Sequence, residues 1–173
     1  MKASSTALDL QLYWAQPSIF ERHFELHSEK SLLGGLHFET PSAAYGMLIT
    51  AGAATKRWTF KGARFHLKPL VTIREEGGND DLAVYRPQLW GGGWVEFVKG
   101  SRFHWKSISF WGTEWGFSNA QEELLFVLKP KPLDLLKVQS VVAIGAPWHD
   151  LEELPLLLML GWYLRVCDSY DTR

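Results

Sequence analysis

The feature that most constrains this chain is an apolar run near its C-terminus that has no polar face. Residues 154–167 place Leu, Met, Trp and Tyr in every direction around a 3.6-residue period, so a helix here must be enclosed on most sides. The run is shorter than the roughly 17–25 residues that cross a bilayer, which argues against a membrane span. Asp150 and Glu153 resemble a capping box, and Pro155 offers a later start with residues 150–154 as a preceding turn. We predict a buried helix over residues 151–167.

Most of the chain before this helix has the composition of short strands. Runs rich in Val, Ile, Phe, Trp and Thr alternate with clusters of Gly, Pro, Asn and Asp, which is typical of antiparallel strands joined by turns. The predicted strands cover residues 20–27, 36–39, 46–50, 57–60, 64–68, 70–75, 82–86, 94–98, 102–106, 108–111, 115–117, 124–128 and 139–144. A mainly β sheet of about twelve strands is expected to curl and close, because closure removes its edges. The resulting antiparallel β-barrel is too wide for side chains alone to fill, so we expect the C-terminal α-helix inside it.

The length of 173 residues fits one domain. We expect residues 1–19 to form an N-terminal extension, residues 20–167 the barrel with its central helix, and residues 168–173 a tail. The core is well supplied, because 9 Trp, 10 Phe and 5 Tyr can each bury a large apolar area.

The order of these elements resembles the tubby C-terminal-like superfamily, which includes the LURP-one-related proteins and the phospholipid scramblases. The resemblance lies in many Trp- and Phe-bearing strands followed by the hydrophobic helix at residues 154–167, and it covers residues 20–167. It implies a barrel threaded by its helix and an association with membrane phospholipids and phosphoinositides. It assigns no ligand residues in this chain.

A repeated segment supplies the candidate binding residues. Residues 61–68 recur as residues 99–106 with six of eight positions identical, and period-two alternation puts the basic residues of each copy on one strand face. The two basic rows are Arg64, His66 and Lys68, and Arg102, His104 and Lys106. Such rows could hold an anionic headgroup, with protonation of the histidines strengthening binding at low pH. The alternative is the ordinary solvated face of two half-buried strands.

Other motifs give no positive sign of catalysis or of a cofactor. His23, Glu25 and His27 share a strand face, but its first and third side chains are about 13 Å apart, too far to hold one metal ion unaided. Gly91–Gly93 lacks the Lys-Ser/Thr of a phosphate loop, so no cofactor is expected. The single cysteine, Cys167, excludes an intrachain disulfide, and residues 1–17 lack a signal-peptide core. These features predict a cytoplasmic protein, peripheral at a membrane.

A formal net charge of -1 argues against a generic nucleic-acid binder. The leading prediction is a non-enzymatic binding or scaffold module whose partner is anionic membrane lipid or a protein, in an oligomeric state that the sequence leaves open. The first alternative is a carrier barrel of the lipocalin or nitrobindin type that holds a fatty acid or haem, with His66 or His104 as a ligand. An enzyme whose site assembles only in space is the third hypothesis. A helix inside the barrel argues against the carrier.

Overall fold

The computed structural model describes residues 8–49, 55–63, 70–131 and 139–171. They form twelve strands, a short 3₁₀ helix and one α-helix. The elements are β1 (Leu8–Ala15), β2 (His23–His27), β3 (Leu32–Thr40), β4 (Ala43–Leu48), β5 (Lys56–Ala63), β6 (Leu70–Glu75), β7 (Asp81–Pro87), β8 (Gly93–Phe97), β9 (Arg102–Ser107), β10 (Trp115–Ser118), β11 (Leu124–Pro130), β12 (Ser140–Gly145), η1 (Ala146–Trp148) and α1 (Leu154–Asp171).

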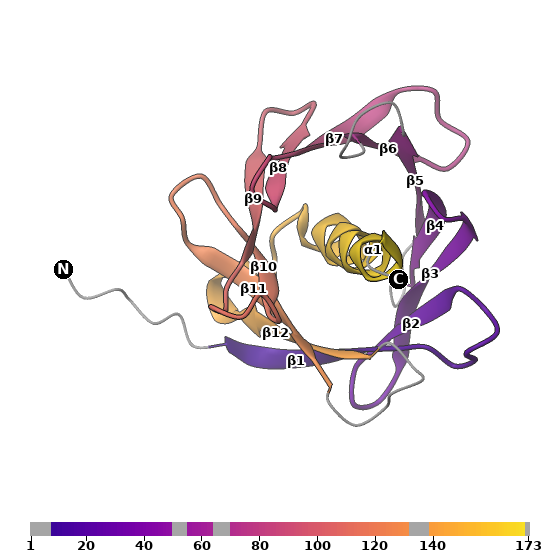
Figure 1. The fold of residues 1–173 in the computed structure, drawn as a ribbon, viewed down its shortest axis with the longest axis horizontal. Coiled ribbons are helices and arrows are strands. Elements are labelled where there is room, and N and C mark those ends of the chain that lie inside the picture. The colour runs from indigo at the N-terminus through magenta and orange to yellow at the C-terminus, as the bar shows by residue number, and fades with distance from the viewer. Residues whose placement is uncertain (1–7, 50–54, 64–69, 132–138, 172–173) are drawn as a thin grey trace.

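The strands close into an antiparallel barrel, as the sequence predicted (Figure 1). Each strand pairs with its neighbours in the sequence, and β1 also pairs with β12, so the ring has no free edge. Closure satisfies the backbone groups that an edge strand would leave open to other chains.

Two predicted segments differ from the structure. Residues 1–19 were expected to lie outside the barrel, yet β1 is the strand that closes it, with Leu12 and Trp14 facing the core. Residues 108–111 were expected to form a strand, but they lie in the loop between β9 and β10, with Phe110 and Trp111 exposed. The predicted strand at residues 64–68 lies outside the described residues.

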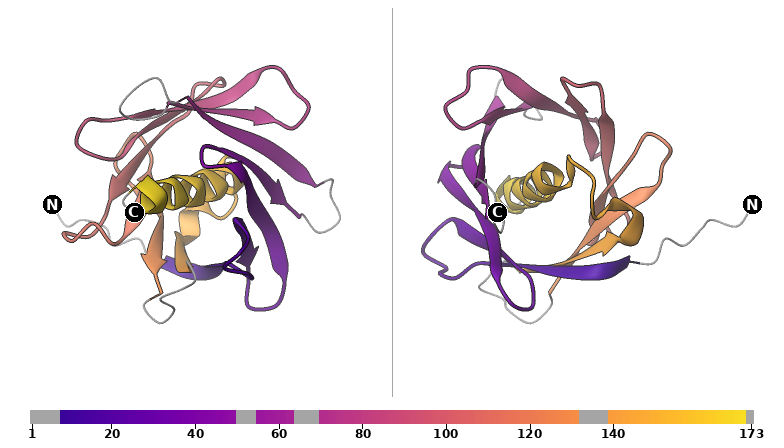
Figure 2. Two further views of the ribbon diagram at one scale, coloured as in Figure 1. Left: turned by 45° about the vertical axis from the view of Figure 1, so that its right-hand side comes forward. Right: turned by 180° about the vertical axis from the view of Figure 1, so that it is seen from behind.

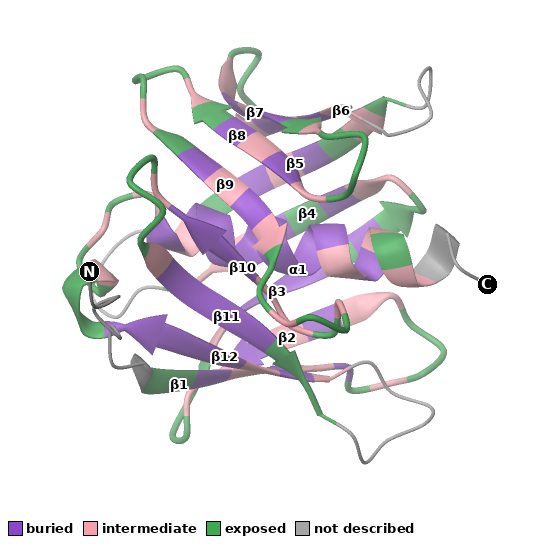
Figure 3. Cartoon of the chain, turned by 60° about the vertical axis from the view of Figure 1, so that its left-hand side comes forward, coloured by how far each residue is buried: buried purple, intermediate pink, exposed green. Residues whose placement is uncertain are grey.

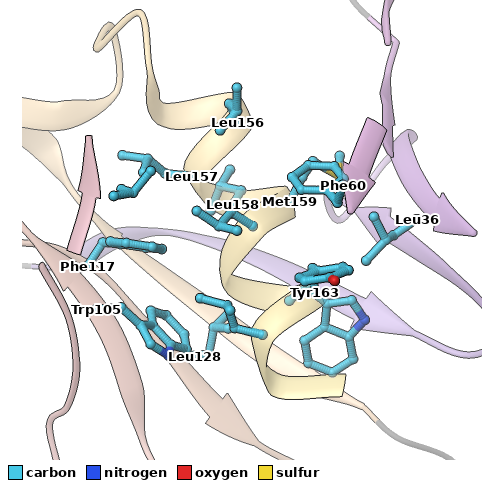
Figure 4. Close-up of a cluster of buried hydrophobic side chains, with 14 of the residues drawn as sticks. Leu36, Phe60, Trp105, Phe117, Leu128, Leu156, Leu157, Leu158, Met159 and Tyr163 are labelled. Carbon is cyan, nitrogen blue, oxygen red and sulfur yellow. The ribbon is translucent and has the colours of Figure 1, made fainter. Parts of the chain in front are cut away.

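Helix α1 lies inside the ring of strands, which Figures 1 and 2 show from several directions. It begins at Leu154, next to Pro155, and it continues to Asp171 through part of the predicted tail. Leu157, Met159 and Leu160 are fully buried. Figure 4 shows Leu157 and Met159 among side chains of the surrounding strands. The helix therefore supplies the centre of the core, as its lack of a polar face required. No helix in the described part of the chain meets the length and apolarity that a bilayer-spanning helix needs.

Aromatic stacking locks α1 against the barrel wall. Trp162 stacks on Trp14 of β1 with ring centroids 5.4 Å apart. Tyr163 stacks on Phe38 of β3 and Phe60 of β5, each at 5.5 Å between centroids. These pairs add orientation-specific stabilisation to the area that they bury.

The loops alternate between the two ends of the barrel, because consecutive strands are antiparallel neighbours. Helix α1 starts at one end, where Lys99 Nζ lies 2.7 Å from the Glu152 carboxylate. It runs toward the other end, where the Tyr163 hydroxyl donates to the Ser42 carbonyl at 2.7 Å. We call these ends the α1-start rim and the α1-end rim; the second lies toward the mark C in Figure 3. The described loops of the α1-end rim are β1–β2, β3–β4, β7–β8 and β9–β10.

Candidate functional site

The barrel interior, where a carrier would hold its ligand, is occupied by α1. Gly161 brings the helix against the wall: a Cβ at this position would lie 3.2 Å from the Trp105 ring. The buried residues of the strands and of α1 form one hydrophobic cluster. This packing removes the main support for the fatty acid or haem carrier, and His104 lies on the outer wall rather than inside.

The structure describes only one of the two predicted basic rows. Arg64, His66 and Lys68 lie outside the described residues. In β9, Phe103 and Trp105 are buried, whereas Arg102, His104 and Lys106 lie on the outer face, as the alternation predicted.

Each basic side chain of this second row has an acidic neighbour. Arg102 Nε lies 3.3 Å from a Glu96 carboxylate oxygen. Glu122, in the loop between β10 and β11, reaches back to both other residues: it pairs with Lys106, and its second oxygen lies 3.7 Å from His104 Nδ1. The row is therefore electrostatically compensated by the protein itself, which weakens it as a site for an anionic headgroup.

Trp94 completes this outer surface. Its ring stacks on the His104 ring at 4.4 Å between centroids and 5° between planes. The Arg102 guanidinium lies 4.2 Å from the centroid of the same indole ring. Stacking and cation–π contact hold the three side chains as a layered unit, so the row stabilises the wall.

The pKa of His104 is lowered chiefly by burial, although the nearby Glu122 carboxylate opposes the shift. His104 therefore takes up a proton less readily in the folded protein than in the unfolded chain. As the pH falls through the histidine range, protonation favours the unfolded chain, and the free energy of unfolding decreases. The wild-type melting temperature should therefore decrease from about pH 7.5 to about pH 5.5, a range that spans the ordinary histidine pKa of about 6.5. His104→Gln should make this decrease smaller in thermal melting followed by circular dichroism.

The exposed His37 supplies the matched control, because His37→Gln leaves His104 and its neighbours in place. A His104→Gln protein with the full wild-type pH dependence would show that another group is responsible.

The polar face of β2, formed by His23, Glu25 and His27, is also internally paired. One Glu25 carboxylate oxygen lies 2.8 Å from His27 Nε2, and the other lies 3.6 Å from His23 Nε2. Within the residues that the structure describes, no group of three His, Cys, Asp or Glu is placed to hold a metal ion. The row is best explained as a hydrogen-bonded strand face.

The most unusual surface is a set of exposed apolar side chains on loop tips. Among the described residues, five large apolar side chains are more than four-fifths exposed. They are Phe20 (91%), Leu89 (87%), Trp90 (98%), Phe110 (93%) and Trp111 (83%). All five belong to loops of the α1-end rim, namely β1–β2, β7–β8 and β9–β10. We call this set the aromatic rim.

Tight turns present these side chains to solvent. Around Trp90, the Gln88 N–H donates to the Gly92 carbonyl at 3.0 Å, and Gly91 and Gly92 both have positive φ. A Cβ at Gly92 would lie 2.2 Å from the Trp105 carbonyl oxygen, so only glycine fits there. The β9–β10 tip is likewise held by the Ser109 hydroxyl, which accepts from the Thr113 and Glu114 N–H groups at 3.0 Å.

The two rims differ in chemistry. Carboxylates dominate the described loops of the α1-start rim, with Glu76 and Asp80 between β6 and β7 and Glu122 and Glu123 between β10 and β11. At the α1-end rim, the exposed basic residues Arg86, Lys129 and Lys131 lie near the ends of β7 and β11. Both rims carry charges of both signs, since Glu21 and Glu114 lie in loops of the α1-end rim and Lys30 and Lys99 in loops of the α1-start rim. The clearest difference between the rims is therefore the aromatic rim itself.

The sequence prediction missed this surface because aromatic residues favour strands. Residues 108–111 fit a strand by composition, and the same propensity extended the strand that ends at His27 back to Phe20. A usable signal was present: the pairs Leu89-Trp90 and Phe110-Trp111 are each followed directly by glycine, which marks a turn.

Comparison with protein-family models, curated proteins and solved structures finds no match for this chain. The resemblance to the tubby-like barrels therefore stays a prediction.

Proposed function

We propose that this protein is a non-enzymatic binding module that docks on an anionic phospholipid surface through the aromatic rim. The observation that carries the proposal is the gathering of Phe20, Leu89, Trp90, Phe110 and Trp111 at one end of the barrel. Covering such exposed apolar side chains is favourable because it removes them from water, and exposed apolar surface of this kind marks an interaction site.

A lipid interface suits this arrangement better than a protein partner. The five side chains sit on three separate loop tips around a rim, whereas protein interfaces centre on a packed patch with a buried core. Trp is preferred at the boundary between hydrocarbon and headgroups, and Phe and Leu supply apolar side chains that bury into it. The basic residues Arg86, Lys129 and Lys131 near this rim complement anionic headgroups.

The test is vesicle co-sedimentation of a triple variant, Trp90→Ser, Phe110→Ser and Trp111→Ser. If each ring contributes about 1 kcal/mol, less than the roughly 1.5–3 kcal/mol of full burial, partition into anionic vesicles should fall about 100-fold. The fold should be retained, because these residues are exposed in the structure.

The matched control is the double variant Arg102→Gln and Lys106→Gln, which removes two positive charges from the outer wall away from the loop tips. Since both cations have carboxylate partners, binding should change by less than about twofold. Equal binding of the triple variant and the wild type would disprove docking through the rim. Wild-type protein that binds no vesicles would leave the protein-partner hypothesis in its place.

A further inference from the structure

A small cleft opens beside the C-terminal part of α1, between the helix and strands β11 and β12. It has a volume of about 70 Å³. Its lining includes Arg165 and Trp162 of the helix, Thr113 of the β9–β10 loop, and Gln139 at the approach to β12. Thr113 belongs to the loop that carries Phe110 and Trp111, so the cleft lies at the aromatic rim.

Arg165 is the only charged residue in the apolar run of residues 154–167. Its side chain is partly buried, and its guanidinium lies 5.7 Å from the centroid of the Trp115 ring. Burial lowers its pKa, and Asp168 opposes this effect. Keeping a cation here is costly unless an anion compensates it.

Three other arginines, on the barrel wall, each make a close ion pair. Arg57 lies 3.4 Å from Glu76, Arg74 lies 2.7 Å from Asp81, and Arg102 lies 3.3 Å from Glu96. Among the described residues, no such ion pair forms at Arg165. Its guanidinium lies near the Trp115 ring, and its acidic neighbour is Asp168, three residues further along α1. Arg165 thus differs from them in offering its fork of donors to the cleft.

A second observation points to the same place. Trp162, which lines the cleft, is 2% exposed, and its indole N–H finds no acceptor among the described residues. A buried donor without an acceptor calls for an unseen partner, such as a water molecule or a ligand atom. A water molecule needs about 10–15 Å³ of cavity volume, so the cleft has room for about five atoms of that size. This matches the five heavy atoms of a phosphate group.

We infer that the Arg165 cleft binds a phosphate group, through the guanidinium of Arg165 and the neutral donors around it. The inference deepens the proposed function, on which the lipid form of the ligand rests, because the aromatic rim would bring a headgroup phosphate to this cleft. The same chemistry also fits a free phosphate ester. Charge-assisted, bidentate contact to phosphate oxygens is the interaction for which arginine is best suited.

The experiment has a soluble arm and a vesicle arm. In the first, glycerol phosphate is titrated into the protein, and binding is measured by calorimetry and by the NMR signal of the Arg165 Nε–H group. Arg165→Gln should weaken binding about tenfold or more, because it removes a charge-assisted contact. Arg165→Lys keeps the charge but loses the fork, so it should retain part of the affinity. Arg102→Gln is the matched control and should bind as the wild type does.

In the second arm, vesicles of phosphatidylcholine are compared with vesicles that also contain phosphatidic acid. The wild type should bind the mixed vesicles more tightly, because the phosphate monoester of phosphatidic acid carries no choline group, and Arg165→Gln should lose this difference. Melting temperatures establish that the variants are folded, and if Arg165→Gln does not fold, Arg165→Lys decides between the outcomes.

The two arms separate the sources of the phosphate. Arg165-dependent binding in the soluble arm alone identifies a free phosphate ester, and in the vesicle arm alone it identifies a lipid headgroup. The inference is overturned if neither phosphate probe binds the wild type, or if binding does not depend on Arg165. A wild type that binds glycerol phosphate through Arg165 but binds no vesicle would refute the proposed membrane docking and leave the phosphate site standing.

Discussion

Replacing Leu160 with Asp should abolish folding. Leu160 is fully buried at the centre of the barrel, where α1 meets the inward side chains of the strands. An unpaired carboxylate in such an interior costs several kcal/mol, and the substitution also removes the apolar contacts of the leucine. The total is comparable to the whole stability of a domain, about 5–15 kcal/mol. The expected result is insoluble protein, or soluble protein without a cooperative thermal transition.

The matched control is Leu89→Asp, which makes the same chemical change at a side chain that is 87% exposed. Its melting temperature should stay close to that of the wild type, because exposed substitutions usually shift stability by less than about 0.5 kcal/mol. A Leu160→Asp protein that melts cooperatively at the wild-type temperature would contradict the buried position of α1.

Truncating Trp105 to Ala should be the most destabilising of the aromatic-to-alanine changes in the wall of β9. Trp105 is 1% exposed, stacks on Trp115 at 5.6 Å and lies 4.9 Å from Phe117 between ring centroids. It also fills the space opposite Gly161, so its loss leaves a cavity between the wall and α1. Such truncations cost about 3–5 kcal/mol, which corresponds to a decrease in melting temperature of about 6–20 °C in a domain of this size.

Trp90→Ala is the matched control for this change, because Trp90 is 98% exposed. Differential scanning calorimetry should show a large decrease for Trp105→Ala and almost none for Trp90→Ala. The opposite order would mean that the ring of Trp90 is buried in the folded protein and that the aromatic rim is not a free surface.

The local hydrophobic pattern of the sequence predicted much of the fold. The apolar residues around every side of α1 required an enclosed helix, and the alternation in β9 placed Phe103 and Trp105 inward. Both inferences follow from the 3.6-residue and two-residue periods of helix and strand, which depend only on nearby residues. The barrel followed from the number of strands and from the need to hide sheet edges.

The candidate sites depended more on contacts between distant parts of the chain. Arg102, His104 and Lys106 were identified correctly as an outward row, yet their compensation by Glu96 and Glu122 could not be predicted. Glu122 lies in the loop between β10 and β11 and has a left-handed backbone conformation, with φ 63°. No sequence motif at Glu122 predicts this conformation. The net charge at a site includes every charged group close to it, whichever part of the chain supplies the group. A row of basic residues along one strand therefore does not determine the net charge of the site.

The sequence by itself determined that this chain would be a closed β-barrel around one apolar helix, because burying that helix and closing the sheet are the ways to remove its apolar surface and edges from water. Only the tertiary structure decided that β1 closes the ring against β12, since pairing between strands at opposite ends of the chain has no local signature. It also decided that Phe110 and Trp111 lie on an exposed loop tip and that Arg165 lines a cleft beside the end of α1. Propensity describes which backbone shape a residue favours, whereas exposure and charge compensation depend on what the rest of the chain packs beside it.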